Sequence, residues 1–173
     1  MTENLKHLDY PRVTEIISDV LGKSLPAQFY LQRGSIFHRI IHLTLNGIID
    51  ENTIDARLIP HYHQLKKFIS VINPKPKYVE KMFAHHTLKY RGTPDLFTDT
   101  GILVDFKTNS KTDVVEMQLG GYAGLLENAG EKVKKCWCVV FTEDNFEIFD
   151  YNKESCKRLF IACLTIYNWK RGL

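Results

Sequence analysis

The sequence lacks the hydrophobic segments that secretion and membrane insertion require. Its N-terminal stretch, MTENLKHLDYPR, has no apolar core of the kind found in signal peptides. No window approaches the roughly 18–20 apolar residues that span a bilayer. Low-complexity tracts and internal repeats are absent as well. We therefore expect a cytoplasmic, intracellular protein whose 173 residues form a single domain.

Cysteine is scarce, with four residues in the chain. Cys136 and Cys138 would share one face of a strand, and Cys156 and Cys163 lie seven apart in a helical stretch. None of them forms C-x-x-C, so the usual spacing of a zinc pair is missing. Buried, reduced core thiols are the favoured interpretation, and a metal or cluster site is the alternative.

The charge of the chain is modest, with a formal net value of +3, but its distribution is uneven. Residues 61–91 contain a single acidic residue, Glu80, and the following basic residues: Lys66, Lys67, Lys75, Lys77, Lys81, Lys89 and Arg91. This segment predicts either a solvated basic surface or a local positive field that favours a polyanion.

Hydrophobic periodicity, prolines and glycines divide the chain into helices and strands. Helices are expected over residues 11–21, 26–47, 53–72 (with Pro60 beginning or interrupting the element), 113–128 and 153–170. A strand is expected from residue 78 through 83, and a second one approaches residue 91. Further strands are expected over 94–98, 102–106, 134–142 and 146–151. This order predicts an α/β fold, a small mixed β-sheet flanked by helices. Within the single domain, 1–173, it separates a helical N-terminal part (1–73), a meander with its helix (78–128) and a C-terminal hairpin with its helix (134–170).

Residues 91–109, RGTPDLFTDTGILVDFKTN, contain the most informative pattern. Asp99-Thr100-Gly101 fits a three-residue hairpin loop in which the glycine takes the left-handed conformation. Paired residue numbers then sum to 200, which places Asp95 opposite Asp105 with Cβ atoms about 4.5–5.5 Å apart. Lys107 lies two residues after Asp105 and projects from the same strand face.

Two carboxylates at that separation repel each other, so one pKa rises unless a cation lies between them. Hard oxygen ligands suit Mg²⁺ or Mn²⁺, and an adjacent lysine adds charge where phosphodiester hydrolysis develops it. The alternative is an exposed edge hairpin with both acids in solvent. Asp105 argues against it, because it interrupts the apolar run of residues 102–106.

Pro94-Asp95 followed by Asp105-Phe106-Lys107 resembles the bipartite motif of the PD-(D/E)XK nuclease superfamily. Residues 117–126, MQLGGYAGLL, resemble the Q-x-x-x-Y helix of its RecB-like exonuclease branch, with Gln118 and Tyr122 on one helical face. Residues 33–38, RGSIFH, resemble the G-x-x-x-H helix of that branch, and Glu80 is a candidate match to the acidic residue before the meander. The resemblance covers residues 33–126.

The resemblance implies a restriction-endonuclease-like core and assigns roles to individual residues. Its catalytic residues are Asp95, Asp105, Lys107, Gln118 and Tyr122. Its metal ligands are Asp95, Asp105, the Phe106 carbonyl and His38, with Glu80 close to the metal; Arg33, Arg91 and Lys111 would contact DNA phosphates. For His38 the alternative is a hydrogen-bonded core histidine, and for Gln118 and Tyr122 it is a purely structural packing of the helix on the sheet.

The implied activity is Mg²⁺- or Mn²⁺-dependent hydrolysis of DNA, as an exonuclease on single strands or ends in recombination, repair or replication. No cysteine precedes residue 136, so we expect no iron–sulfur cluster of the kind many RecB-like nucleases carry. A Walker A loop is missing, so any helicase or recombination partner would be a separate protein. The compact size suggests a phage, virus or mobile-element origin. The alternatives are a structure-specific or restriction-like endonuclease, a non-catalytic nucleic-acid-binding subunit and a metal phosphohydrolase that is not a nuclease.

Overall fold

The computed structural model describes residues 9–22 and 28–173, with side chains from residue 36 onward in the second range. The helices are α1 (Val13–Leu21), α2 (Gln28–Leu45), α3 (Ile59–Ile72), α4 (Val115–Asn128) and α5 (Lys153–Lys170), with short 3₁₀ turns at Glu51–Thr53 and Ala56–Leu58. The strands are β1 (Pro76–Val79), β2 (Phe83–His85), β3 (Tyr90–Gly92), β4 (Leu96–Thr98), β5 (Ile102–Thr108), β6 (Lys135–Phe141) and β7 (Phe146–Tyr151).

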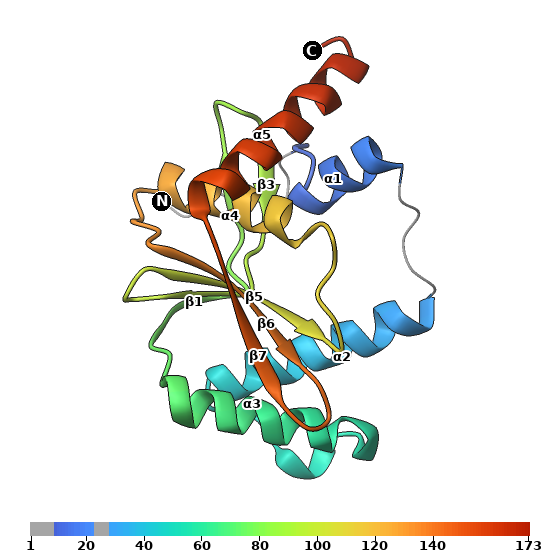
Figure 1. Cartoon of the computed structure of the whole chain (residues 1–173), viewed down its shortest axis with the longest axis vertical. Coiled ribbons are helices and arrows are strands. Elements are labelled where there is room, and N and C mark those ends of the chain that lie inside the picture. Colours follow the sequence, from blue (N-terminus) through green and yellow to red (C-terminus); the bar gives the residue numbers. More distant parts are fainter. Residues whose placement is uncertain (1–8, 23–27) are drawn as a thin grey trace.

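Five of these strands form one mixed sheet in the order β1-β4-β5-β6-β7. Strands β5 and β6 are parallel and are joined through α4, whereas the other neighbours are antiparallel. Helices α1, α4 and α5 cover one face and α2 and α3 the other (Figure 1). The predicted mixed sheet flanked by helices is therefore confirmed.

Strand β5 contributes to both hydrophobic layers, because its side chains alternate between the two faces of the sheet. Val104 and Phe106 pack against α2 and α3, and Leu103 packs on the α1, α4 and α5 side. By the same alternation Asp105 and Lys107 project towards the side of Leu103 and α4. A carboxylate thus enters the interior between two apolar layers.

The elements before the meander differ from the prediction. The predicted stretch through residue 83 is divided into β1 and β2, because Glu80 takes a left-handed conformation (φ 46°) that ends the first strand. The helix predicted to start at residue 53 starts at Ile59, with Pro60 in its first turn. Proline is compatible with a first turn, where its missing N–H has no intrahelical partner.

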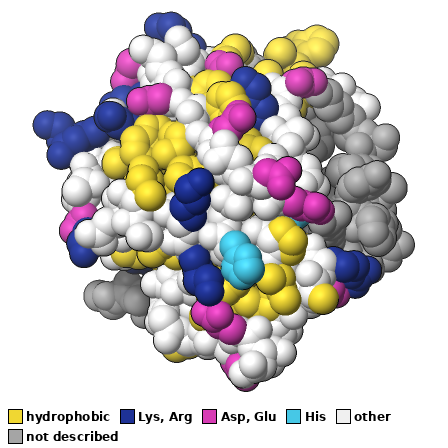
Figure 2. All heavy atoms as spheres, turned by 60° about the horizontal axis from the view of Figure 1, so that its bottom comes forward, with side chains coloured by type: hydrophobic (Ala, Val, Ile, Leu, Met, Phe, Trp, Pro, Cys, Tyr) yellow, Lys and Arg dark blue, Asp and Glu magenta, His cyan; other side chains and the backbone are white. Residues whose placement is uncertain are grey.

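Part of the basic segment between residues 61 and 91 is paired with acids. Lys66 pairs with Glu51, and Lys77 pairs with Glu131. Figure 2 views the molecule from the side of α2 and α3, and there Lys and Arg side chains lie between acidic and hydrophobic ones. On this side of the molecule, the solvated, mixed surface is the better of the two interpretations.

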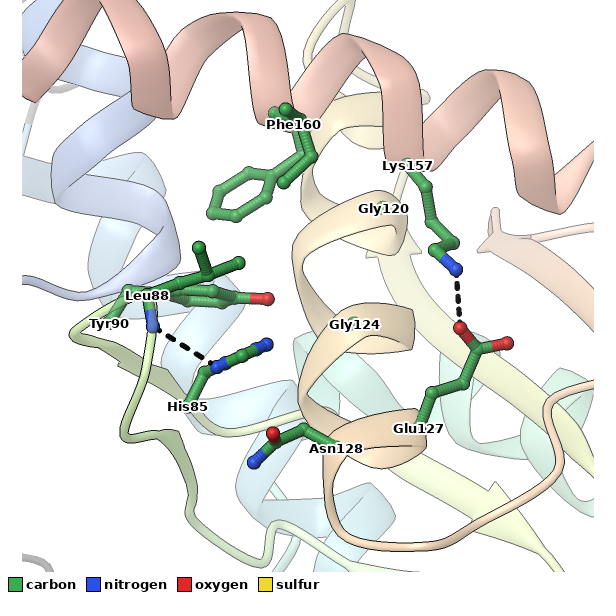
Figure 3. A pocket seen from close by; sticks show the side chains of 10 residues that line it. His85, Leu88, Tyr90, Gly120, Gly124, Glu127, Asn128, Lys157 and Phe160 are labelled. Carbon is green, nitrogen blue, oxygen red and sulfur yellow. Dashed lines mark hydrogen bonds and ion pairs between the residues drawn. The ribbon is translucent and has the colours of Figure 1, made fainter.

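Close packing of α4 on α5 and on β3 depends on glycine. A Cβ atom added at Gly120 would lie 2.0 Å from the carbonyl oxygen of Cys156, and one at Gly124 would lie 2.5 Å from the Tyr90 hydroxyl. In Figure 3 both glycines lie on the side of α4 that borders a hollow of about 210 Å³, between α5 and the β2–β3 hairpin. None of the predicted catalytic residues lines this hollow.

We expect Gly120→Ala to destabilise the protein by about 1–3 kcal/mol or more, since a backbone carbonyl cannot move aside like a flexible side chain. Urea unfolding monitored by circular dichroism would measure the loss. Gly130→Ala is the glycine control for a position with free space, although its φ of 86° adds strain of its own. An unchanged midpoint for Gly120→Ala would contradict the close helix contact.

All four cysteines are buried and none forms a disulfide, which confirms the predicted burial of these thiols in the core. Burial raises the pKa of the Cys136 and Cys138 thiols to about 12, which disfavours the thiolate form. Among residues 9–22 and 28–173, no helix combines the length and the hydrophobicity needed to cross a bilayer.

Candidate active site

The hairpin between β4 and β5 sets the geometry of the site. Leu96 pairs with Val104 and Phe97 pairs with Leu103, so paired residue numbers sum to 200 as predicted. Gly101 adopts a φ of 89°, and its N–H donates to the Thr98 carbonyl. The turn therefore fixes the register that brings the end of β4 alongside the middle of β5.

Asp95 lies immediately before β4 rather than within the ladder, which is a correction to the expected cross-strand pair. One carboxylate oxygen (Oδ2) accepts a hydrogen bond of 2.8 Å from the backbone N–H of Phe106. The Asp95 carboxylate is thereby held against the residue that follows Asp105. The Phe106 side chain is fully buried on the α2 and α3 side.

Asp105 is a buried acid, with 3% of its surface exposed. Its Oδ2 lies 2.6 Å from the Nζ of Lys107. Burial raises the pKa of Asp105 above its ordinary value; Lys107 opposes this rise, and the neighbouring Asp95 adds to it. For Lys107, the negative charges of Asp105 and Asp95 outweigh the effect of burial and raise its pKa.

His38 reaches the acid pair from α2 on the other side of the sheet. Its Nδ1 lies 3.2 Å from Asp95 Oδ1, and both side chains are mostly buried. The Asp95 charge raises the pKa of His38 to about 9. Burial disfavours ionisation of Asp95, but His38 and then Lys107 outweigh it, so its pKa lies below the usual range. Two acids and two cations thus form one electrostatic cluster.

Helix α4 contributes Gln118 and Tyr122, the two predicted residues of the Q-x-x-x-Y pattern. Tyr122 is 8% exposed; burial, followed by the charges of Asp105 and Asp95, raises its pKa well above normal. The Gln118 Oε1 is buried and has no hydrogen-bond partner among the described residues. Gln118 therefore carries an unsatisfied amide oxygen in the part of α4 that follows β5.

Of the remaining predicted residues, Glu80 is bonded to this cluster, and the others have partners elsewhere or lie outside the described side chains. Glu80 pairs with Nδ1 of His42 at 3.2 Å, and its backbone N–H donates to the Asp95 carbonyl. Lys111 lies 4.3 Å above the ring of Phe149, and Arg91 donates from Nε to the Tyr10 carbonyl. The side chain of Arg33 lies outside the described residues.

Two histidines without an expected role contribute to the same region. His42 lies one helical turn after His38 and ties α2 to Glu80; the four-residue spacing could have indicated this shared face. His61 is fully buried in α3, and its Nε2 lies 3.0 Å from the Oδ1 of Asn109. Asn109 follows β5 in a left-handed conformation (φ 66°), so this contact anchors the strand end that carries Lys107.

Comparisons with solved structures identify similar folds. A protein of Eubacterium rectale described as a candidate exonuclease superposes with a TM-score of 0.67 at 13% identity, over 99% of this chain and 84% of that one. The alkaline exonuclease of Laribacter hongkongensis gives a TM-score of 0.55 at 14% identity, over 96% and 89% of the two chains. The chain shares their fold. No protein-family model and no curated protein matches the sequence.

The residues of this cluster fit a divalent cation by their chemistry. Two carboxylates and one imidazole form a donor set suited to Mg²⁺ or Mn²⁺, and the neighbouring acids raise the energy of the site when no cation lies between them. Among the described residues, no three His, Cys, Asp or Glu side chains already form a metal-binding group. His38 and Lys107 lie against the two acids and offset part of their negative charge.

The His38–Asp95 pair predicts a pH dependence of stability in protein treated with EDTA. Because folding raises the pKa of His38 from about 6.5 to about 9, its protonation stabilises the folded state fully below pH 6.5. This contribution is lost as the pH rises towards 9. We expect the melting temperature of the wild type to fall across that window by a few degrees more than that of His38→Ala. Parallel curves for the two proteins would contradict the pairing.

Proposed function

We propose that this chain is a divalent-metal-dependent deoxyribonuclease of the PD-(D/E)XK superfamily, similar to its RecB-like branch, and that it acts as an exonuclease on single-stranded DNA or DNA ends. The observation that carries the proposal is the juxtaposition of Asp95, Asp105 and Lys107 around one hairpin, with His38 beside them. The likeness in fold to the two proteins described as exonucleases supports it.

The ligands of the cation would be Asp95, Asp105, the Phe106 carbonyl and His38. When bound, a divalent cation polarises the phosphoryl oxygen and lowers the pKa of the attacking water. Glu80 stays a candidate near the metal, since its backbone is bonded to Asp95 and its carboxylate to His42.

The side chains around the cation would orient the reactants. Lys107 keeps its proton, because the two acids raise its pKa, and its ammonium can orient the attacking water and stabilise negative charge on the phosphorane. Gln118 can hold this ammonium or a phosphate through its unpartnered amide oxygen or its NH₂ group. Tyr122 would line the path of the strand.

Digestion of end-labelled DNA tests the proposed function. Linear and circular single strands, duplexes and an RNA of the same sequence would be incubated with Mg²⁺, Mn²⁺ or EDTA. We expect cleavage of linear DNA with either metal and none with EDTA. DNA binding without cleavage in Mn²⁺ would overturn the enzymatic proposal in favour of a binding subunit.

The same assay separates exonuclease from endonuclease activity. An exonuclease releases short products from linear strands and leaves circular single-stranded DNA intact, because a circle offers no end. Cleavage of the circle would assign the same centre to an endonuclease.

A further inference from the structure

Two hollows adjoin each other on the α1 side of the sheet. The smaller, about 300 Å³, is lined by residues that include Arg12, Thr93 and Tyr122. The larger, about 780 Å³, is lined by residues that include Tyr10, Lys89 and Tyr167. Arg91 lines both hollows, which lie next to each other along β3 and the start of α1, and we refer to the two together as the groove.

The inner end of this groove lies beside the candidate active site. Two of its lining residues, Thr93 and Tyr122, are close to the acids. Thr93 precedes Asp95 by two residues, and Tyr122 lies on α4, where the charges of Asp105 and Asp95 contribute to its raised pKa. A Cβ atom at Gly92 would lie 2.9 Å from the Tyr122 ring, so the backbone of β3 passes directly over this ring. A chain leaving the acid pair along β3 would enter the groove at this point.

Three segments far apart in the sequence build the groove walls. The start of α1, strand β3 and the C-terminal part of α5 lie near one another (Figure 1). Arg91 is fixed by its backbone N–H, which donates to the Pro11 carbonyl, and by its Nε, which donates to the Tyr10 carbonyl. The guanidinium of Arg171 lies 3.7 Å from the centre of the Tyr167 ring.

The groove carries more positive than negative charge. Its cations are Arg12, Lys89, Arg91 and Arg171, and its acids are Asp9 and Glu15. Arg171 is paired with Asp19 just outside the groove, at 3.2 Å. Glu15 is partly neutralised by Arg12, whose Nε lies 3.7 Å away. Lys89 is exposed and has no ion-pair partner among the described residues. Cations interleaved with tyrosines are the chemistry that single-stranded nucleic acids need, because phosphates meet charge and bases stack on rings.

We propose that this groove, from Tyr122 to Arg171, binds the single strand on one side of the cleavage position. The proposal rests on the proposed function, since the active site supplies the inner end of the track. Lys89 would neutralise a phosphate, and Tyr10 and the face of the Tyr167 ring away from Arg171 would offer stacking surfaces to bases several nucleotides from the centre.

Length-dependent binding tests the track. Fluorescence anisotropy in EDTA would compare labelled oligothymidylates of about 4, 8 and 12 nucleotides. For Lys89→Ala and for Tyr167→Ala we expect about tenfold weaker binding of the longest strand and unchanged binding of the shortest. Lys89→Ala should also lower the slope of log affinity against log salt by about 0.7. Lys66→Ala, on α3 at the other face of the sheet, is the matched control and should bind like the wild type.

A change in the opposite direction makes the test sharper. Asp9→Asn removes negative charge from the groove and should tighten binding of the longest strand, whereas a groove for another ligand would leave it unchanged. The proposed track would be wrong if Lys89→Ala and Tyr167→Ala bound the longest strand as tightly as the wild type does. It would also be wrong if these variants lost the same affinity for strands of all lengths. These results are independent of cleavage: if the wild type cleaves DNA while these variants bind normally, only the track fails. If the variants lose length-dependent binding but the wild type never cleaves, only the proposed activity fails.

Discussion

Replacing Asp105 by alanine is expected to lower DNA cleavage by about a thousandfold or more while the protein remains folded. Asp105 is buried, shares the hairpin with Asp95 and contacts Lys107, so its loss removes both a proposed metal ligand and the partner of the proposed catalytic amine. Initial rates of product release from end-labelled DNA would measure the effect. Calorimetry of the same samples would show whether the variant unfolds as cooperatively as the wild type.

A control variant separates the loss of this acid from damage to the hairpin. Burial and the neighbouring Asp95 raise the pKa of Asp105, so its ionised form is costly to keep in the metal-free protein. Asp99→Ala is the matched control, because Asp99 is an exposed acid in the turn of the same hairpin. Equal cleavage by the wild type and Asp105→Ala would refute the assigned site, whereas loss of activity in both variants would point to disruption of the hairpin.

Replacing Lys107 by methionine is expected to lower kcat about 100–1000-fold with a much smaller change in KM. Methionine keeps most of the apolar stem and removes the ammonium that lies 2.6 Å from Asp105. If this ammonium stabilises charge that develops only in the transition state, its removal affects the chemical step more than binding. Single-turnover cleavage at saturating enzyme would isolate that step.

Lys111→Met is the control that distinguishes a catalytic role of the Lys107 amine from the effect of removing any positive charge that binds DNA. Lys111 lies on the loop after β5, above the Phe149 ring, and would contact a phosphate without touching the acid pair. Its replacement should raise KM and leave kcat nearly unchanged. The same kcat loss in both variants would argue against a distinct role for Lys107.

The register of the hairpin at the centre could be predicted from the sequence because it depends on local rules, although Asp95 lies just before β4 and not in the predicted cross-strand pair. The glycine at position 101 fixes a short hairpin turn, the turn fixes the register, and strand alternation places Lys107 on the side of Asp105. Helix α5 was also predictable: an amphipathic stretch follows Asn152, whose side chain accepts from the Ser155 N–H and begins the helix.

Contacts between distant segments were beyond the reach of local rules. The left-handed conformation of Glu80 divides the expected strand into two. The Glu80 carboxylate forms an ion pair with His42, which lies far from it in the sequence. Similarly, the buried pair of His61 and Asn109 joins α3 to the end of β5. A periodic pattern shows that such a histidine lies on an apolar helix, but only the tertiary fold decides which partner satisfies it.

The most direct test of the central claim is anomalous scattering from a crystal of the protein soaked in Mn²⁺. We expect a peak within about 2.0–2.3 Å of carboxylate oxygens of both Asp95 and Asp105, with His38 turned from its ion pair towards the cation. A peak elsewhere, or intact His38–Asp95 and Lys107–Asp105 pairs with no peak at saturating Mn²⁺, would contradict a metal-dependent centre at this hairpin.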